Sequence, residues 1–159
     1  LAPPMFVDVV NVTSAADMAD VVKSKAAEQD IIIMTAAVAD FCPSHPADEK
    51  IKKNDSSYES VIELECTEDI LSYLGAHKAK GQLICGFSME TQNMLENSKA
   101  KLAKKNADMI VANNLKVAGA GFGTDTNVVT LITADDCTEL EIMDKSCVAA
   151  RIMDRLLQM

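Results

Sequence analysis

Two groups of residues in this chain have the types and spacing needed to bind a phosphorylated ligand. The first follows an apolar run at residues 31–35 and consists of small residues that end in an acid and an aromatic: Ala36, Ala37, Val38, Ala39, Asp40 and Phe41. Small side chains allow a ligand to approach the backbone closely, and a carboxylate can bind a ribose hydroxyl or a metal ion. The second group is cationic (Lys50, Lys52 and Lys53) and can neutralise phosphates. Together they indicate nucleotide chemistry.

A second lysine cluster lies in residues 93–105, which are predicted to form a helix. Its members are Lys99, Lys101, Lys104 and Lys105. Lys101 and Lys105 are four residues apart and therefore share one face of a helix. The concentration of cations in a chain of net charge −9 favours an anionic ligand. A solvated helix face whose lysines complement the helix dipole is the simpler alternative.

A third candidate segment is expected to be a turn at the end of an apolar strand at residues 83–87. It contains Gly86, Phe87, Ser88, Met89 and Glu90. The glycine would let the backbone approach a base, and backbone groups could then read the edge of a pyrimidine. An ordinary strand-to-helix turn is the alternative, just as Asp40 could simply be a turn or helix cap.

The pattern of apolar residues predicts an α/β fold with a doubly wound, mostly parallel Rossmann-like sheet and a C-terminal β-hairpin and helix, in a single domain at residues 1–159. Strands are expected at residues 7–12, 31–35, 61–66, 83–87 and 108–112, with a hairpin at 128–133 and 139–143. Helices are expected at residues 14–29, 67–78 and 93–105 and after Asp144, with loops at 41–57 and 116–127. In such sheets ligands bind at the carboxyl ends of the strands, where the candidate segments lie.

Composition excludes several classes of function. A net charge of −9 argues against nonspecific nucleic-acid binding, and no apolar run approaches the roughly 20 residues of a membrane helix. Five cysteines without a Cys-x-x-Cys pair indicate free, buried thiols in a reducing cytoplasm. The two histidines, His45 and His77, have no partner at metal-ligand spacing, which argues against zinc.

The order and spacing of these segments resemble the bacterial phosphopantothenate–cysteine ligases, also called phosphopantothenoylcysteine synthetases, the ligase half of a bifunctional coenzyme A biosynthesis protein. The resemblance covers essentially the whole chain. It is carried by residues 36–41 together with 49–53, then by residues 86–91, 104–108, 111–113, 121–125 and Asn127.

The resemblance implies a two-step reaction. The carboxylate of 4′-phosphopantothenate would attack the α-phosphate of CTP, giving an acyl-cytidylate and pyrophosphate, and the amine of L-cysteine would then displace CMP. It also implies that Ala36–Asp40 approach the nucleotide, with Asp40 as a possible magnesium ligand, and that Lys50 acts from a flap. The segment from Gly86 to Glu90 would read cytosine, with Phe87 beside the base, and Lys101 and Lys105 would hold the nucleotide. A cytoplasmic homodimer is implied, with Mg²⁺, and with FMN only on an upstream decarboxylase domain if one is fused.

One departure from the family pattern leads to a further expectation. The glycine-rich first strand and turn of these ligases, with its Gly-Gly-Thr, has no counterpart here, and the chain begins with Leu1. We therefore expect that an N-terminal strand–helix segment is missing and that this chain is a poor ligase or inactive. Two other classes remain open: a nucleotide-binding Rossmann-like oxidoreductase domain, although no Gly-x-Gly-x-x-Gly opens a helix, and a non-catalytic interaction module.

Overall fold

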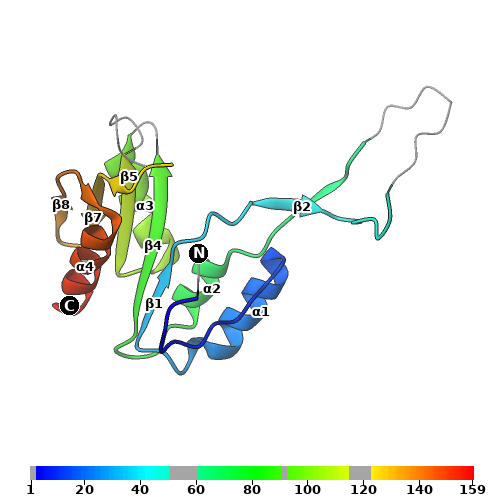
Figure 1. The fold of residues 1–159 in the computed structure, drawn as a ribbon, viewed down its shortest axis with the longest axis horizontal. Helices are drawn as coiled ribbons and strands as arrows, with labels where there is room; N and C mark the ends of the chain where they lie inside the picture. Colours follow the sequence, from blue (N-terminus) through cyan, green and yellow to red (C-terminus); the bar gives the residue numbers. More distant parts are fainter. Residues whose placement is uncertain (1–2, 51–60, 91–92, 115–122) are drawn as a thin grey trace.

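A five-stranded sheet forms the centre of the computed structural model, which describes residues 3–50, 61–90, 93–114 and 123–159 (Figure 1). The strand order is β1-β4-β5-β7-β8. These strands are β1 (Ile31–Met34), β4 (Leu83–Glu90), β5 (Met109–Asn114), β7 (Val129–Ile132) and β8 (Cys137–Glu139). β1, β4 and β5 are parallel, whereas β7 is antiparallel to both β5 and β8.

The expectation of a mostly parallel sheet is therefore wrong, and the sheet is mixed. A parallel connection needs a crossover, usually a helix, to return the chain to the same end of the sheet. In the described part of the connection from β5 to β7 the chain forms only the short strand β6 (Thr126–Asn127) and no helix. The predicted hairpin is confirmed by the pairing of β7 with β8, but its second strand lies at residues 137–139 and not at 139–143.

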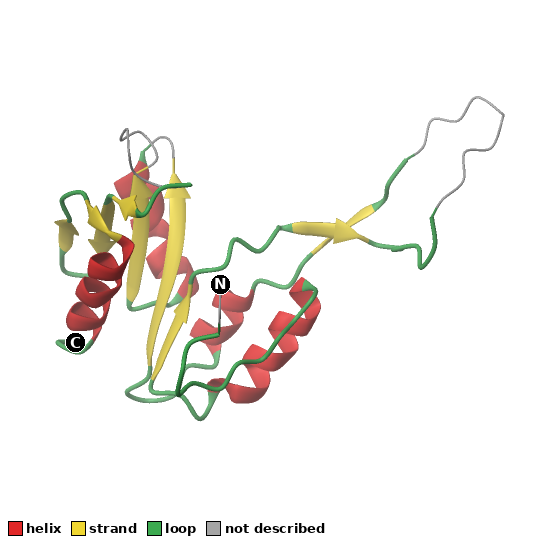
Figure 2. Ribbon diagram, viewed as in Figure 1, coloured by secondary structure: helices red, strands yellow, loops and turns green. Residues whose placement is uncertain are grey.

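Helices cover both faces of the sheet (Figure 2). On one face, α4 (Lys145–Leu156) packs Val148, Ile152 and Leu156 against Met109 and Val111. On the other face, α1 (Ala15–Ala26) and α2 (Ile70–Ala76) pack against Ile84 and the even-numbered side chains of β1, and α3 (Met94–Lys105) lies beside α2 and β5. Successive side chains of β1 and β4 thus pack into the cores on opposite faces of the sheet, as the pleat of a strand requires.

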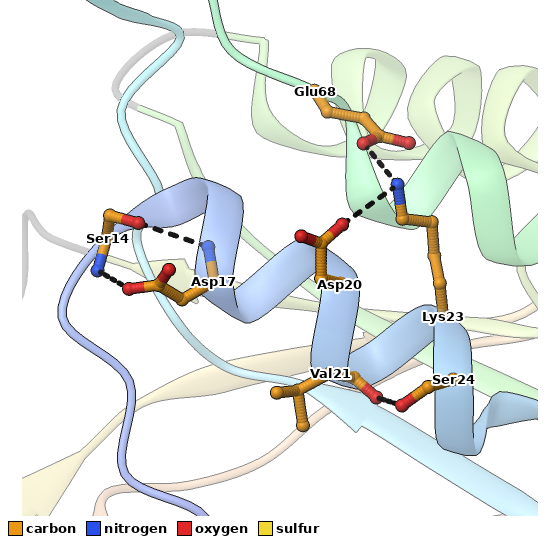
Figure 3. Close-up of polar contacts among 7 residues, drawn as sticks. All are labelled: Ser14, Asp17, Asp20, Val21, Lys23, Ser24 and Glu68. Carbon is orange, nitrogen blue, oxygen red and sulfur yellow. Dashed lines mark hydrogen bonds and ion pairs between the residues drawn. The ribbon is translucent and has the colours of Figure 1, made fainter.

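Helix α1 begins where the sequence predicts it. Ser14 accepts a hydrogen bond from the backbone N–H of Asp17 at 3.1 Å, and the Asp17 carboxylate accepts one from the backbone of Ser14 at 3.0 Å (Figure 3). This capping box satisfies donors that would otherwise be unpaired at the helix start. Hydrogen bonds from Thr13 and Ser14 lower the pKa of Asp17.

The strand predicted at residues 7–12 is wrong, because the segment is irregular in the structure. Its valines are β-branched and read as a strand, but none of them is buried, and Val7 is 56% exposed. β1 pairs only with β4 and is the edge of the sheet. Consequently β1 is only half-buried along its whole length, although its side chains pack against the cores on both faces of the sheet.

Two short strands form a ribbon that extends away from the sheet, one in the region expected to be a loop and one within the strand expected at residues 61–66 (Figure 1). They are β2 (Phe41–Pro43) and β3 (Leu64–Cys66), which pair antiparallel. We call residues 41–50 and 61–66 the arm. The loop prediction is thus wrong at residues 41–43, and residues 51–60 lie outside the described part.

Strand β4 is longer than predicted, which changes the setting of one candidate segment. Residues 86–90 continue the strand in register with residues 110–114 of β5, so they form no turn. Ser88 interrupts the apolar pattern of the sequence, but its hydroxyl lies 2.8 Å from that of Ser98, and both residues are buried. This paired hydroxyl lets the strand continue through the core.

The remaining expectations are met in part. α2, α3 and α4 form where predicted, and β6 pairs with β9 (Met143–Asp144). Asp144 occupies the N-cap position of α4 without making a side-chain cap hydrogen bond. The expectation of buried thiols holds only for Cys85, where burial and the nearby Asp108 raise the pKa to about 12. No helix in the described residues is long and apolar enough to cross a membrane.

Candidate functional site

A cleft of about 210 Å³ lies where β1 ends, between the base of the arm, the start of α2 and one face of α3. Its lining residues are Met34, Ala36, Val38, Ala39, Asp40, Thr67, Glu68, Asp69, Ile70, Leu71, Phe87, Lys101 and Lys105. Segments far apart in the sequence therefore meet at the carboxyl-end side of the parallel strands, where sheets of this kind bind ligands.

The cleft brings together five of the residues predicted to bind a nucleotide: Ala36, Asp40, Phe87, Lys101 and Lys105. Asp40 is exposed, and its carboxylate makes no hydrogen bond or ion pair with the side chains that the structure describes. The backbone beside it is fixed, because the Thr67 N–H donates to the Asp40 carbonyl at 2.9 Å and the Thr67 hydroxyl donates to Ala39. The Asp40 carboxylate thus has no partner among the described side chains, and Thr67 holds the backbone that carries it.

The four lysines of α3 separate into two pairs. Lys101 and Lys105 are half-buried and line the cleft, whereas Lys99 and Lys104 are exposed and lie outside it. Lys101 Nζ donates to the Phe87 carbonyl at 2.9 Å. Lys99 and Lys104 thus fit a solvated helix face, whereas Lys101 and Lys105 line the cleft, and their role in binding a ligand stays a prediction.

Lys105 is held by α2. Its ammonium donates to the Ser72 hydroxyl at 3.0 Å and forms an ion pair with the Asp69 carboxylate, and its side chain is only 12% exposed. Partial burial raises the pKa of Asp69, but the hydrogen bonds from Lys105 and from the Ser72 N–H outweigh it, so that the pKa is lowered. Asp69 is therefore the charged partner of Lys105 at neutral pH.

The backbone of Lys105 is also fixed by α2. A Cβ added to Gly75 would lie 1.8 Å from the Lys105 carbonyl oxygen, so the two helices approach as closely as only glycine allows. The Asn106 side chain donates to the Gly75 carbonyl at 2.7 Å, with Asn106 itself ending α3 in a left-handed conformation at φ 48°. α2 thus sets both the main chain and the ammonium of Lys105.

The residues predicted along β4 have different surroundings from those expected. A Cβ on Gly86 would lie 2.6 Å from the side chain of Leu71, so packing against α2 accounts for this glycine. The Ser88 hydroxyl is committed to Ser98, and Met89 is 44% exposed outside the cleft. The side chain of Glu90 lies outside what the structure describes. Phe87 lines the cleft, but its side chain also packs against the core beneath α4.

Three other predicted residues do not line the cleft. Ala37 is exposed next to it, and Phe41 and Lys50 belong to the arm, which leads away from the sheet (Figure 1). Phe41 is 58% exposed. The proposed role of Lys50 as a residue acting from a flap therefore remains a prediction.

The segment that leads from the arm into α2 was not predicted as part of the site. It contributes Thr67, Glu68, Asp69, Ile70 and Leu71 to the cleft. In the sequence it was interpreted only as the start of the helix expected at residues 67–78; in the structure Asp69 caps α2 and accepts the Ser72 N–H at 2.9 Å. Lys23 of α1 forms an ion pair with the preceding acid, Glu68, at 2.7 Å, and Figure 3 shows these two side chains pointing toward each other.

The acids of the cleft are compatible with magnesium bound together with phosphates. Asp40, Glu68 and Asp69 are all lining residues. Within the described residues no group of three or more acids, cysteines or histidines is placed to hold a metal ion by itself. Magnesium in phosphate sites commonly uses one or two carboxylates and completes its shell with phosphates and water, so a single carboxylate such as that of Asp40 suffices.

The fold and the cleft define an α/β domain with a site suited to an anionic ligand. The particular family follows from comparison with known proteins, since the model of the DNA/pantothenate metabolism flavoprotein C-terminal domain matches residues 1–159. The chain belongs to this family.

Two curated relatives are 45% identical to the chain. One is the coenzyme A biosynthesis bifunctional protein CoaBC of Bacillus subtilis, for which the match covers 97% of this chain and 37% of the relative. The other is named cysteine/cysteine sulfinic acid decarboxylase, from an unknown prokaryotic organism, and the match covers 95% of this chain and 42% of the relative. The chain thus spans about two fifths of these relatives.

Solved structures agree with the family. The crystal structure of the C-terminal domain of CoaBC superposes with a TM-score of 0.79 at 41% identity, covering 99% of this chain and 70% of that chain. A Cab2 H337A mutant solved with phosphopantothenate-cysteine has a TM-score of 0.64 at 18% identity, covering 92% of this chain and 52% of that chain, which supports the fold alone.

Proposed function

We propose that this chain is a nucleotide-binding phosphopantothenate–cysteine ligase domain that uses CTP. In the first step, a carboxylate oxygen of 4′-phosphopantothenate bonds to the α-phosphorus of CTP, and the bond to pyrophosphate breaks. In the second step, the amine of L-cysteine bonds to the acyl carbon and CMP leaves. The products are 4′-phosphopantothenoylcysteine, CMP and pyrophosphate, within coenzyme A biosynthesis.

The observation that carries this proposal is the pairing of two anchored ammonium groups with a free carboxylate across one cleft. Lys101 and Lys105 lie on α3, and Asp40 lies on the opposite segment after β1. A nucleotide bound with magnesium needs cations for its phosphates and a carboxylate for its metal ion, and the cleft offers both. The family membership and the relative named CoaBC agree with this assignment.

Each ammonium retains the hydrogen-bonding capacity needed for a phosphate. A lysine has three donors. Lys101 uses one on the Phe87 carbonyl, and Lys105 uses two on Asp69 and Ser72. The remaining donors are available to phosphate oxygens, whose negative charge grows as pyrophosphate leaves, and fixed cations stabilise that charge without reorganisation.

Lys50 would act from the arm as the catalytic cation on the phosphates and on the acyl-cytidylate. Closure of the arm over the cleft would exclude water, which would otherwise hydrolyse that intermediate. Phe87 would lie beside the cytosine, with the β4 segment that also contains Ser88, Met89 and Glu90 reading its edge. Ala36, Ala37 and Phe41 would border the nucleotide.

Magnesium would supply charge neutralisation for the triphosphate when bound with it. Asp40 is the residue we assign to hold it, as an exposed carboxylate that lines the cleft. FMN has no role in this domain and would belong to a decarboxylase domain of a longer protein.

The proposed assembly is a cytoplasmic homodimer. The arm supports it, because its apolar side chains Phe41, Val61, Ile62 and Leu64 are 58% to 81% exposed on a ribbon that extends from the sheet (Figure 2). Apolar area of this kind is normally buried by a partner.

Calorimetric titration of the chain with CTP and with ATP, in magnesium, tests the function. We expect CTP to bind more tightly, and Asp40→Asn to weaken CTP binding about tenfold, since one charge-assisted contact is worth roughly 1.5 kcal/mol. Asp135→Asn, which changes an exposed acid outside this cleft, is the matched control. Equal affinity for both nucleotides, or an Asp40→Asn variant that binds like the control, would contradict the assignment.

A further inference from the structure

We infer that Asp69 is a positioning residue for the reaction, and that it holds the ammonium of Lys105 in the cleft before the nucleotide arrives. The inference deepens the proposed function and rests on it. Asp69 was identified from the sequence only as the start of a helix, and the structure gives its carboxylate a second task.

The two oxygens of Asp69 are used differently. Oδ1 accepts the backbone N–H of Ser72 at 2.9 Å and caps α2, while Oδ2 forms the ion pair with Lys105 Nζ. The Ser72 hydroxyl accepts from the same ammonium at 3.0 Å. Asp69 and Ser72, at the start of α2, thus contact the ammonium of a lysine that belongs to α3 at two points.

These two contacts restrict the Lys105 side chain before the ligand binds, so binding does not have to restrict it. A free lysine side chain has many rotamers and loses that entropy when it is ordered. Asp69 and Ser72 order Lys105 before a ligand binds, and the third donor of the ammonium is left for the ligand. Preorganisation of this kind increases affinity without adding a contact to the ligand.

Simple electrostatics predicts the opposite effect of removing Asp69, which makes the proposal testable. Asp69 is an acid in a cleft proposed to bind phosphates, so neutralising it should strengthen anion binding if its charge were all that mattered. A positioning role predicts weaker binding. The sign of the change therefore separates the two roles.

The experiment compares CTP binding by the unsubstituted chain, Asp69→Asn, Lys105→Ala and the double variant, by calorimetry in magnesium. Asparagine caps a helix about as well as aspartate, so α2 keeps its start. We expect Asp69→Asn to weaken CTP binding about tenfold, and to change it less than about twofold when Lys105 is already alanine, because interacting residues are not additive. Asp136→Asn is the control: it removes an acid that pairs with Arg155 at 3.5 Å outside the cleft, and should leave binding unchanged.

Two results would overturn the inference. Asp69→Asn could bind CTP as tightly as the unsubstituted chain or more tightly, or it could weaken binding equally with and without Lys105. A second readout does not need a nucleotide: the rate at which Lys105 is acylated by an N-hydroxysuccinimide ester, followed by peptide mass spectrometry. We expect this rate to rise several-fold in Asp69→Asn and to stay constant in Asp136→Asn.

The acylation rate separates failure of the inference from failure of the proposed function. If the unsubstituted chain binds neither CTP nor ATP, the proposed function fails for this chain. A faster acylation of Lys105 in Asp69→Asn then still supports the inference that Asp69 holds the Lys105 ammonium, whereas an unchanged rate overturns it.

Discussion

The cleft and the arm both carry lysines that we assign to a phosphorylated ligand, but the surroundings of these lysines differ. Lys101 and Lys105 are half-buried, and each ammonium is fixed by hydrogen bonds to neighbouring elements. Lys50 is exposed on the arm, outside the cleft. The difference suggests a division of work, in which the cleft lysines determine affinity and the arm lysine determines rate. The predictions below test that division.

The largest effect is expected at Lys50. Lys50→Ala should lower kcat about 100-fold, because a cation that meets only the developing charge of the transition state contributes to rate. Its effect on the Kd for CTP should stay within about threefold. Pyrophosphate release with CTP, 4′-phosphopantothenate and cysteine measures the rate, with the exposed Lys80→Ala as control. A Kd change as large as the kcat change would show that Lys50 is simply another binding residue.

Gly75→Ala should destabilise the cleft wall itself. The new methyl would overlap the Lys105 carbonyl oxygen, which is backbone and cannot rotate away, so we expect a loss of about 3 kcal/mol in the free energy of unfolding. Urea denaturation provides the measurement. Gly81→Ala is the control, because nothing lies within 4 Å of an added Cβ there and only its φ of 85° is unfavourable, for a loss of about 1 kcal/mol. Similar losses for the two variants would mean that α2 and α3 are not packed this closely.

Substitutions in the arm should weaken formation of the dimer. Ile62→Lys combined with Leu64→Lys places charge on its exposed apolar surface, and should raise the dimer dissociation constant about 30-fold, or roughly 2 kcal/mol. Light scattering across a concentration series measures this. Glu63→Gln is the control, and the monomer should still bind CTP if affinity resides in the cleft. A double variant that dimerises normally would remove the arm from the interface.

The smallest effect is a pH dependence at Asp69. Its pKa in the folded chain is lowered, so its contribution to stability is present above the unfolded pKa of about 4 and is lost as pH falls through the folded value. The side chain is half-exposed, so solvent screening keeps this below about 1 kcal/mol. The unsubstituted chain should therefore exceed Asp69→Asn in stability at pH 7, and this excess should shrink as the pH falls from about 4 toward 2. A difference that is constant between these pH values would argue against the ion pair.

Much of the fold could be predicted, because residues close together in the sequence determine where its helices begin and which side chains share a face. Ser14 and Asp17 have the spacing of a capping box, and α1 begins there; Lys101 and Lys105 are four residues apart, and both line the cleft. The strand expected at residues 7–12 could not be rejected from sequence, since β-branched residues favour a strand only where a neighbouring strand is available to pair.

The site was harder to predict because it depends on contacts between distant segments. Asp69 and Lys105 are 36 positions apart, and only the close approach of α2 and α3 at Gly75 brings them together. Gly86 was assigned to a ligand, but the space beside it holds Leu71. A glycine shows that something approaches the backbone, and the sequence does not say what.

The most direct test of the division between cleft and arm uses the four lysines of α3. CTP affinity would be measured by calorimetry for Lys101→Ala with Lys105→Ala, and for Lys99→Ala with Lys104→Ala, which remove the same charge from the same helix. We predict that the first pair weakens binding about 100-fold and that the second changes it less than about threefold. Equal losses for the two pairs would show that α3 attracts the nucleotide only through its overall charge, and would contradict the cleft as the binding site.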